Sequence, residues 1–241
     1  MSDSAAELEE SGFKIERNVL PASLLSELAR ELERLSEGAG EAVSVQKGDA
    51  AYALRNLLGA SSRIMGILRM SMLPDLLRRF VPEPLYAVRG ILFDKPFRAN
   101  WFVPWHQDLT IAVQERRIIQ PGFARWTVKA GIHHARPPSR FLANMLTARI
   151  HLDDANESNG ALRVVPGSHR EGILPAAKIP ELVERGAHVC AVSAGDVMFM
   201  RPLLLHSSRA TTISGHRRVL HIEFSPDVLP EPVEWMWRVG V

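Results

Sequence analysis

The chain has 241 residues, 46% of them hydrophobic, and its 29 lysine and arginine residues nearly balance 27 acidic residues. This length supports one well-formed hydrophobic core and is short for two, so we expect a single domain over residues 1–241. The arginine pairs are scattered and form no run of basic residues, which argues against a nucleic-acid-binding protein. The oligomeric state stays open.

Cysteine usage and the absence of targeting patterns indicate a compartment. Cys190 is the only cysteine, which rules out an intramolecular disulfide and a thiolate metal cluster and fits a reducing environment. The acidic N-terminus lacks the basic start and apolar stretch of a secretory signal, and no apolar run reaches the roughly 18 residues needed to span a bilayer. We expect a cytoplasmic protein without a membrane partner.

Helical patterns dominate the first third of the chain. Leucines recur at helical spacing over residues 23–35, with charged residues on the opposite face. Two more helical stretches are predicted at 54–70 and 74–80, the second directly after a proline. We expect residues 20–80 to form a helical support that carries no catalytic group.

From residue 85 the pattern changes to short apolar segments broken by Pro, Gly, Asp and Asn, which is typical of strands in an antiparallel sandwich or barrel. The predicted strands are 85–93, 101–106, 145–152, 161–166, 188–192, 196–200 and 218–224. The predicted fold is therefore mainly β with flanking helices (α+β), with a β core over about 85–225.

A long connection, residues 109–144, separates the second and third predicted strands. Connections of this length in compact domains are often functional. Its aromatic and basic side chains favour an active-site lid, and we expect substrate contacts from Trp126, Lys129 or His133. Because neighbouring residues on an extended chain point opposite ways, His133 and His134 cannot both face a substrate.

Candidate metal ligands occur in two places. His106 and Asp108 lie two residues apart on a predicted strand, so their side chains share a face. His206, which follows the apolar strand 196–200, completes a set of two histidines and one carboxylate that leaves open positions on Fe(II). Arg217 and Ser208 follow His206 by eleven and two residues and could hold the far carboxylate of a dicarboxylate cosubstrate.

With these residues the sequence resembles the phytanoyl-CoA dioxygenase-like family of Fe(II)/2-oxoglutarate-dependent oxygenases, over about residues 86–225. Each motif is weak alone, and their order and spacing together are specific. The resemblance rests on Phe93–Pro96, Trp105–Asp108, His151–Asp154, Asn159–Gly160, Val165–His169, Gly195–Asp196, His206–Ser208 and Gly215–Arg217.

The resemblance implies a double-stranded β-helix (jelly-roll) core and an enzyme that hydroxylates a small organic molecule, consuming O2 and 2-oxoglutarate and releasing succinate and CO2. It implies Fe(II) held by His106, Asp108 and His206. It also implies 2-oxoglutarate anchored by Arg217 and Ser208, with Gln107 close to it. Arg149 falls where some members carry a tryptophan facing the cosubstrate, which suggests a more polar pocket wall here.

Three alternatives stay open. Desaturation or epoxidation would use the same site as hydroxylation. A cupin-like metal enzyme that does not use 2-oxoglutarate would have no need of Arg217. A non-catalytic small-molecule sensor on the same fold would have no need of a complete ligand set. The retained Asp108 argues against a halogenase, and no motif in 109–144 identifies the substrate.

Overall fold

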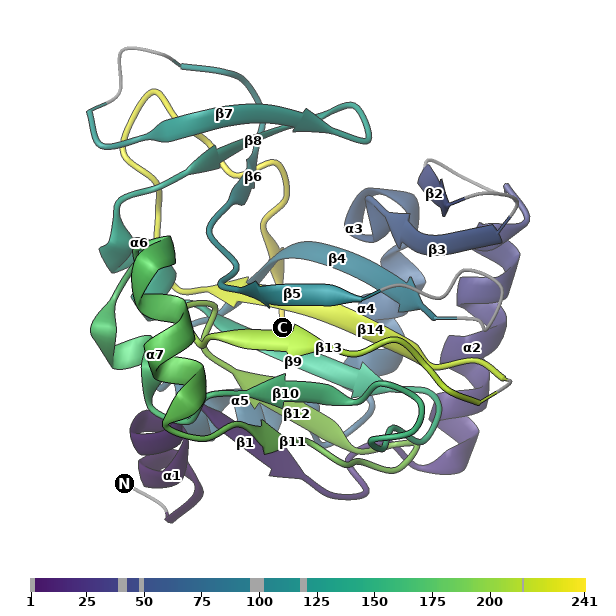
Figure 1. Ribbon diagram of the computed structural model, residues 1–241. Coiled ribbons are helices and arrows are strands. Elements are labelled where there is room, and N and C mark those ends of the chain that lie inside the picture. The colour runs from purple at the N-terminus through teal and green to yellow at the C-terminus, as the bar shows by residue number, and fades with distance from the viewer. Residues whose placement is uncertain (1–2, 39–42, 48–49, 96–101, 118–120, 214) are drawn as a thin grey trace.

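Two antiparallel sheets face each other in the computed structural model of the protein, and helices cover the outer face of the larger sheet (Figure 1). The structure describes residues 3–38, 43–47, 50–95, 102–117, 121–213 and 215–241. This arrangement is the jelly roll with flanking helices that the sequence predicts. No helix in the described ranges is long and apolar enough to cross a membrane.

The larger sheet contains the longest strands. Its order is β1 (Phe13–Glu16), β12 (Val197–Met200), β9 (Leu146–His151), β14 (Arg218–Ser225), β4 (Tyr86–Asp94), β3 (Ala50–Arg55) and β2 (Val43–Lys47), and β15 (Val239–Gly240) pairs with β4. Every residue of β9 is buried. Its apolar residues Ala148 and Ile150 belong to the core beneath the helices, whereas Arg149 lines the interior between the sheets. The alternation of a strand thus places a charged residue inside the sandwich.

The smaller sheet has the order β11 (His188–Val189), β10 (Leu162–Val164), β13 (His206–Ser208) and β5 (Val103–His106). It lies in front of the larger sheet in Figure 1. Apolar side chains of the two sheets, among them Val164, Met198 and Leu204, pack together between them. This packing fixes the spacing of the two sheets.

Four helices cover the outer face of the larger sheet: α2 (Ala22–Ser36), α3 (Leu57–Ala60), α4 (Ser62–Arg69) and α5 (Leu73–Phe80). Helix α2 buries Leu24, Leu28, Leu32 and Leu35, which confirms the predicted amphipathic helix. Complete burial of one such side chain contributes about 1.5–3 kcal/mol. The remaining helices are α1 (Asp3–Ser11), α6 (Ser139–Asn144), α7 (Ile179–Glu184) and the short 3-10 helices Ser168–Glu171 and Ala176–Lys178.

The helical stretch predicted over 54–70 is confirmed for most of its length, but it begins later and consists of two helices, α3 and α4. Strand β3 continues to Arg55, and Asn56 then adopts a left-handed conformation with φ 62°. Ser61 separates α3 from α4 with an extended backbone, and its hydroxyl donates to Glu31 Oε1 of α2 at 2.5 Å. Contacts with the neighbouring sheet and with α2 therefore override a continuous helical pattern.

The seven predicted strands all occur, with shorter bounds in most cases; residue 101, at the start of one of them, lies outside the described residues. Sequence reasoning missed β2 and β3 in the region expected to be helical, together with β1, β13 and β15. It also missed the conformation of 109–144, which forms a three-stranded sheet of β6 (Ile111–Val113), β8 (Ile132–Arg136) and β7 (Ala124–Lys129). Figure 1 places this sheet above β4 and β5.

Candidate functional site

A cavity of about 130 Å³ lies between the two sheets. The smaller sheet and the loop after β5 contribute His106, Asp108 and His206 to its wall. The larger sheet and the segment before β14 contribute Arg149 and Arg217. The structure therefore brings the predicted metal ligands and the predicted cosubstrate anchor into one space.

The two histidines are directly opposite each other on β5 and β13. Their ring centroids are 4.2 Å apart. His106 Nδ1 lies 2.8 Å from the carbonyl oxygen of Pro104, and His206 Nδ1 lies 2.8 Å from that of Leu204. Because a carbonyl can only accept, each Nδ1 carries the hydrogen and each Nε2 keeps its lone pair for a metal.

Asp108 supplies the carboxylate. Its backbone N–H donates to the carbonyl of Pro202, which holds the residue just beyond β5. Asp108 Oδ2 lies 3.7 Å from His206 Nε2 and is buried with no hydrogen-bond partner among the described residues. One ligand atom from each of His106, Asp108 and His206 falls within 4.8 Å of the others. A buried carboxylate oxygen without a donor is suited to a cation.

The protonation states fit a metal site. Burial acts to raise the pKa of Asp108, but the neighbouring histidines outweigh it and lower that pKa, so the carboxylate is ionised at neutral pH. Burial lowers the pKa of His206 to about 3, so its imidazole is neutral. Neutral imidazole and ionised carboxylate are the forms that bind divalent metals.

The other wall of the cavity has an excess of positive charge. Arg217 is 4% exposed, and its Nε and Nη1 have no hydrogen-bond partner among the described residues. Burial and the charge of Arg149 lower the pKa of Arg217 to about 9, and burial lowers the pKa of Arg149 as well. Two buried guanidinium groups at close range are costly unless an anion joins them.

Lys95, which directly follows β4, is a third cation in this group. Its Nζ donates to Ser208 Oγ at 2.7 Å and to the carbonyl of Arg209 at 2.6 Å. The Ser208 hydroxyl in turn donates to the carbonyl of Gly160 at 2.9 Å. Burial and the charges of Arg217 and Arg149 lower the pKa of Lys95 to about 7. The sequence analysis missed Lys95, whose only signal was its place in the Phe93–Pro96 motif.

A chain of hydrogen bonds runs along the wall of the cavity from Arg149. Arg149 Nη1 donates to His221 Nδ1 at 3.1 Å, and His221 Nε2 lies 3.2 Å from Glu223 Oε1. The same oxygen accepts from Arg89 Nη1 at 2.9 Å. The sequence analysis assigned no role to His221, Glu223 or Arg89, which lie on β14 and β4 and line the cavity.

Comparison with known proteins identifies the family. The sequence model for phytanoyl-CoA dioxygenase (PhyH) matches residues 8–219. The chain belongs to the phytanoyl-CoA dioxygenase family. The match includes the three candidate metal ligands, Ser208 and Arg217, so the predicted resemblance is confirmed over most of the chain.

The known proteins and solved structures that resemble this chain are distant in sequence. The ectoine dioxygenase of Bordetella bronchiseptica is 25% identical over 185 residues, which cover 74% of this chain and 53% of that protein. The chain thus spans about half the length of that relative. The structure of EctD from S. alaskensis with bound Fe has a TM-score of 0.73 at 19% identity, covering 96% of this chain and 79% of that one. HygX from Streptomyces hygroscopicus, with nickel and 2-oxoglutarate bound, has a TM-score of 0.64 at 18% identity, covering 96% and 89%.

The structure places the side chain of Gln107 away from the cavity in which the cosubstrate is expected. Its amide nitrogen donates to the carbonyls of Gly172 and Leu203 at 2.8 and 2.6 Å, and its amide oxygen accepts from the backbone N–H of Leu174 at 2.8 Å. Gln107 does not line the cavity. It lies between His106 and Asp108 in sequence, so its side chain points to the opposite side of the chain.

The three predicted lid contacts differ in position. Trp126 stacks on Phe123 and packs against the apolar core of the 109–144 segment. His133 is half-buried, whereas His134 is 3% exposed and close enough to Arg89 and Glu223 for their charges to affect its pKa. Lys129 donates to the hydroxyl of Thr110 at 3.1 Å. Lys129 is therefore the one predicted lid residue that the structure places near the metal candidates, and His134 faces inward in place of His133.

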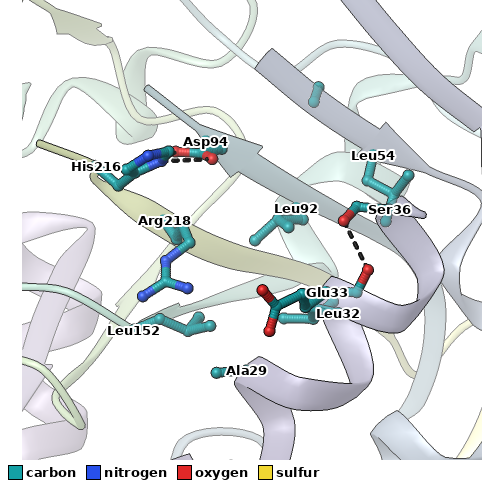
Figure 2. Close-up of a pocket in the computed structure, with 11 residues that line it drawn as sticks. Ala29, Leu32, Glu33, Ser36, Leu54, Leu92, Asp94, Leu152, His216 and Arg218 are labelled. Atoms are coloured by element: carbon teal, nitrogen blue, oxygen red, sulfur yellow. Dashed lines mark hydrogen bonds and ion pairs between the residues drawn. The ribbon is translucent and has the colours of Figure 1, made fainter. Parts of the chain in front are cut away.

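A second cavity, of about 390 Å³, lies between α2 and the outer face of the larger sheet (Figure 2). It is lined by Leu92, Asp94 and Arg218, whereas Ile91, Phe93 and Arg217 face the cavity between the sheets. None of the three metal candidates reaches it. This cavity is larger than the one between the sheets, but the candidate metal ligands and Arg217 line only the latter.

Proposed function

We propose that this member of the phytanoyl-CoA dioxygenase family is a non-haem Fe(II)- and 2-oxoglutarate-dependent dioxygenase that hydroxylates a small organic molecule, with release of succinate and CO2. The observation that carries the proposal is the pairing of a buried His–Asp–His group with Arg217, a buried guanidinium that lacks a carboxylate partner among the described residues. A metal enzyme that does not use a dicarboxylate has no use for that arginine.

His106, Asp108 and His206 would hold the Fe(II). The fit rests on two imidazoles whose Nδ1 atoms contact backbone carbonyls, which leaves the Nε2 atoms for a metal, and on the buried Asp108 oxygen that has no donor among the described residues. A facial set of two histidines and one carboxylate is the ligand pattern of non-haem Fe(II) oxygenases, which leaves open positions for other ligands. The iron in EctD and the nickel and 2-oxoglutarate in HygX support the same use of the fold.

Arg217, Lys95 and Ser208 would bind the far carboxylate of 2-oxoglutarate, with Arg149 on the same wall. A buried guanidinium with unused N–H groups suits a carboxylate, because each of these groups can donate a charge-assisted hydrogen bond. Together the iron, 2-oxoglutarate and O2 supply the oxidising chemistry, and the protein supplies position. The residues contribute by orienting the carboxylate and by keeping the imidazoles in the tautomer that presents Nε2.

Apolar residues of the cavity exclude water from the reacting groups. Ile91, Phe93, Val103 and Leu162 line it between the charged residues. Exclusion of water strengthens the ionic contacts of the site and limits side reactions. We assign the segment 109–144 as the lid over this cavity, because its sheet stands above β4 and β5 (Figure 1). The small-molecule substrate and the cytoplasmic location belong to the same proposal.

The first experiment tests metal and cosubstrate together. Anaerobic protein loaded with Fe(II) and then with 2-oxoglutarate should develop a weak charge-transfer band at about 500 nm, as expected for chelation at an open facial site. We expect His206→Ala to abolish the band and Arg217→Ala to require far more 2-oxoglutarate. His188→Ala and Arg79→Ala, which change exposed residues away from the cavity, serve as matched controls. Iron-loaded wild-type protein without the band would refute the use of 2-oxoglutarate.

A further inference from the structure

The end of the cavity nearest the lid contains a second group of charges. Arg89 and Glu223 are directly opposite each other on β4 and β14, and Arg89 Nη1 lies 2.9 Å from Glu223 Oε1. Both side chains line the cavity that contains the metal candidates. Arg89 also donates to the carbonyl of Thr110 at 3.3 Å. Thr110 follows Asp108 by two residues, so this group lies beside the metal site.

Lys129 approaches the same place from the lid. It is the last residue of β7, at the turn into β8, and its Nζ donates to the Thr110 hydroxyl at 3.1 Å. The turn is held in place because the side-chain amide of Asn56 donates to the carbonyl of Ala130 at 3.0 Å. The ammonium of Lys129 and the guanidinium of Arg89 therefore converge on one threonine.

The charges in this group do not balance. Glu223 accepts from Arg89 and is within hydrogen-bond distance of His221, and Asp108 belongs to the metal site. Across the described ranges Lys129 has no carboxylate within ion-pair distance. Burial, followed by the charges of Arg89 and Arg55, lowers its pKa, as expected for an ammonium among cations. Lys129 is therefore left without a carboxylate counter-ion among the described residues.

The cosubstrate does not supply that counter-ion. Its far carboxylate is assigned to Arg217, Lys95 and Ser208, and Arg149 separates those residues from the lid end along the hydrogen-bond chain through His221 and Glu223. The missing anion must belong to another molecule that enters beside the metal. In the proposed enzyme that molecule is the substrate.

We infer that the substrate is a small monocarboxylate whose carboxylate group is bound by Lys129 and Arg89, next to Thr110 and on the lid side of the metal ligands. This inference rests on the proposed function and specifies its substrate class. A carboxylate would bring one negative charge to the Lys129 ammonium, whereas a phosphate monoester would bring about two. A neutral substrate would leave the Lys129 ammonium half-buried without an anion.

The test measures binding and needs no turnover. Anaerobic protein saturated with Fe(II) and 2-oxoglutarate is titrated with acetate, butyrate and cyclohexanecarboxylate, and with the amide of each, while the charge-transfer band is followed. A parallel titration with cyclohexyl phosphate tests whether a dianion binds more tightly than a carboxylate. Repeating the titration at a higher 2-oxoglutarate concentration controls for carboxylates that displace 2-oxoglutarate from Arg217. The effect of such a competitor on the band becomes weaker, whereas the effect of a carboxylate bound at Lys129 does not.

We expect a carboxylate to bind about tenfold or more tightly than its amide, the effect of one charge-assisted hydrogen bond. Lys129→Met should remove this preference, Lys129→Arg should keep it, and Lys178→Met, at an exposed lysine on another surface, should not change it. The inference is overturned if no carboxylate binds more tightly than its amide, or if the preference for carboxylates survives Lys129→Met. In either case a normal charge-transfer band leaves the dioxygenase proposal standing. Tighter binding of cyclohexyl phosphate also overturns it, and absence of the band refutes both proposals.

Discussion

Arg149 and His221 are directly opposite each other on β9 and β14, and Arg149 Nη1 donates to His221 Nδ1 at 3.1 Å. The imidazole orients a guanidinium whose Nε has no partner among the described residues. Because an arginine cannot accept, Nδ1 of His221 is the acceptor and its hydrogen resides on Nε2, directed to Glu223. One histidine thus links the cosubstrate end of the cavity to the lid end.

Replacing this histidine should affect the cosubstrate more than the metal. We expect His221→Phe, which keeps a ring but removes the acceptor, to weaken 2-oxoglutarate binding by about tenfold because Arg149 is no longer oriented. Titration of the charge-transfer band with 2-oxoglutarate measures this change, and a separate iron titration should give the wild-type value. His188→Phe is the control. Unchanged 2-oxoglutarate affinity would show that Arg149 needs no such support.

Replacing Gln107 distinguishes a structural role of its side chain from a role in binding the cosubstrate. Gln107→Leu leaves the N–H of Leu174 and the carbonyls of Gly172 and Leu203 without their partner, and each buried unpaired group costs about 1–3 kcal/mol. Urea denaturation should therefore show a free energy of unfolding lower by several kcal/mol in total. The affinity of the folded variant for 2-oxoglutarate should stay within about twofold of wild type. A stable variant with weakened 2-oxoglutarate binding would reverse our assignment.

Lys95 should make stability depend on pH. Its pKa is about 7 in the folded protein and about 10.5 when unfolded, so between these values the unfolded chain binds more protons. The contribution of Lys95 to the free energy of unfolding therefore rises with pH over this window, by up to about 1.4 kcal/mol per unit. Urea denaturation at pH 7 and pH 9 should show this rise in wild type and in Lys178→Met, and a smaller rise in Lys95→Met. Equal slopes in all three would contradict the lowered pKa.

Metal binding should stabilise the fold through Asp108. At a free Fe(II) concentration about 100 times the dissociation constant, binding adds about 2.7 kcal/mol, which in a chain of this size raises Tm by about 5–10 °C. Anaerobic thermal denaturation with and without Fe(II) measures the difference. Asp108→Ala should lose most of the shift, whereas Asp75→Ala, at a mostly exposed carboxylate, should retain it. An equal shift in both variants would place the iron elsewhere.

The core strands were predictable as short apolar segments broken by Pro, Gly, Asp and Asn. In β9 and β14 both faces are buried, and apolar residues alternate with charged residues of the cavity. The same alternation brings His106 and Asp108 to one cavity and turns Gln107 away from it. Alternation alone does not decide which of His133 and His134 faces inward, because it requires only that one of them does. The pairing of β8 with β6 and β7 selects His134, and that pairing depends on contacts that single-strand patterns do not encode.

Lys95 and Arg89 could not be assigned from local sequence. A lysine before a proline at the end of a strand is usually exposed, and Lys95 is 1% exposed because the two sheets close over it. Arg89 depends on Glu223, which is 134 positions away in the chain. Strands β2 and β3 were also missed, and they depend on pairing with each other and with β4 at one end of the larger sheet.

The metal candidates His106 and His206 belong to the smaller sheet, whereas Arg217, Lys95 and Arg149 belong to the larger sheet or to segments adjoining it. No single loop sets the distance between the metal candidates and Arg217. The apolar side chains packed between the sheets, such as Met198 and Leu204, set it. In the proposed enzyme, the packing between the two sheets would therefore determine which length of dicarboxylate fits, and selection of a five-carbon cosubstrate would depend on the core as much as on the residues that touch it.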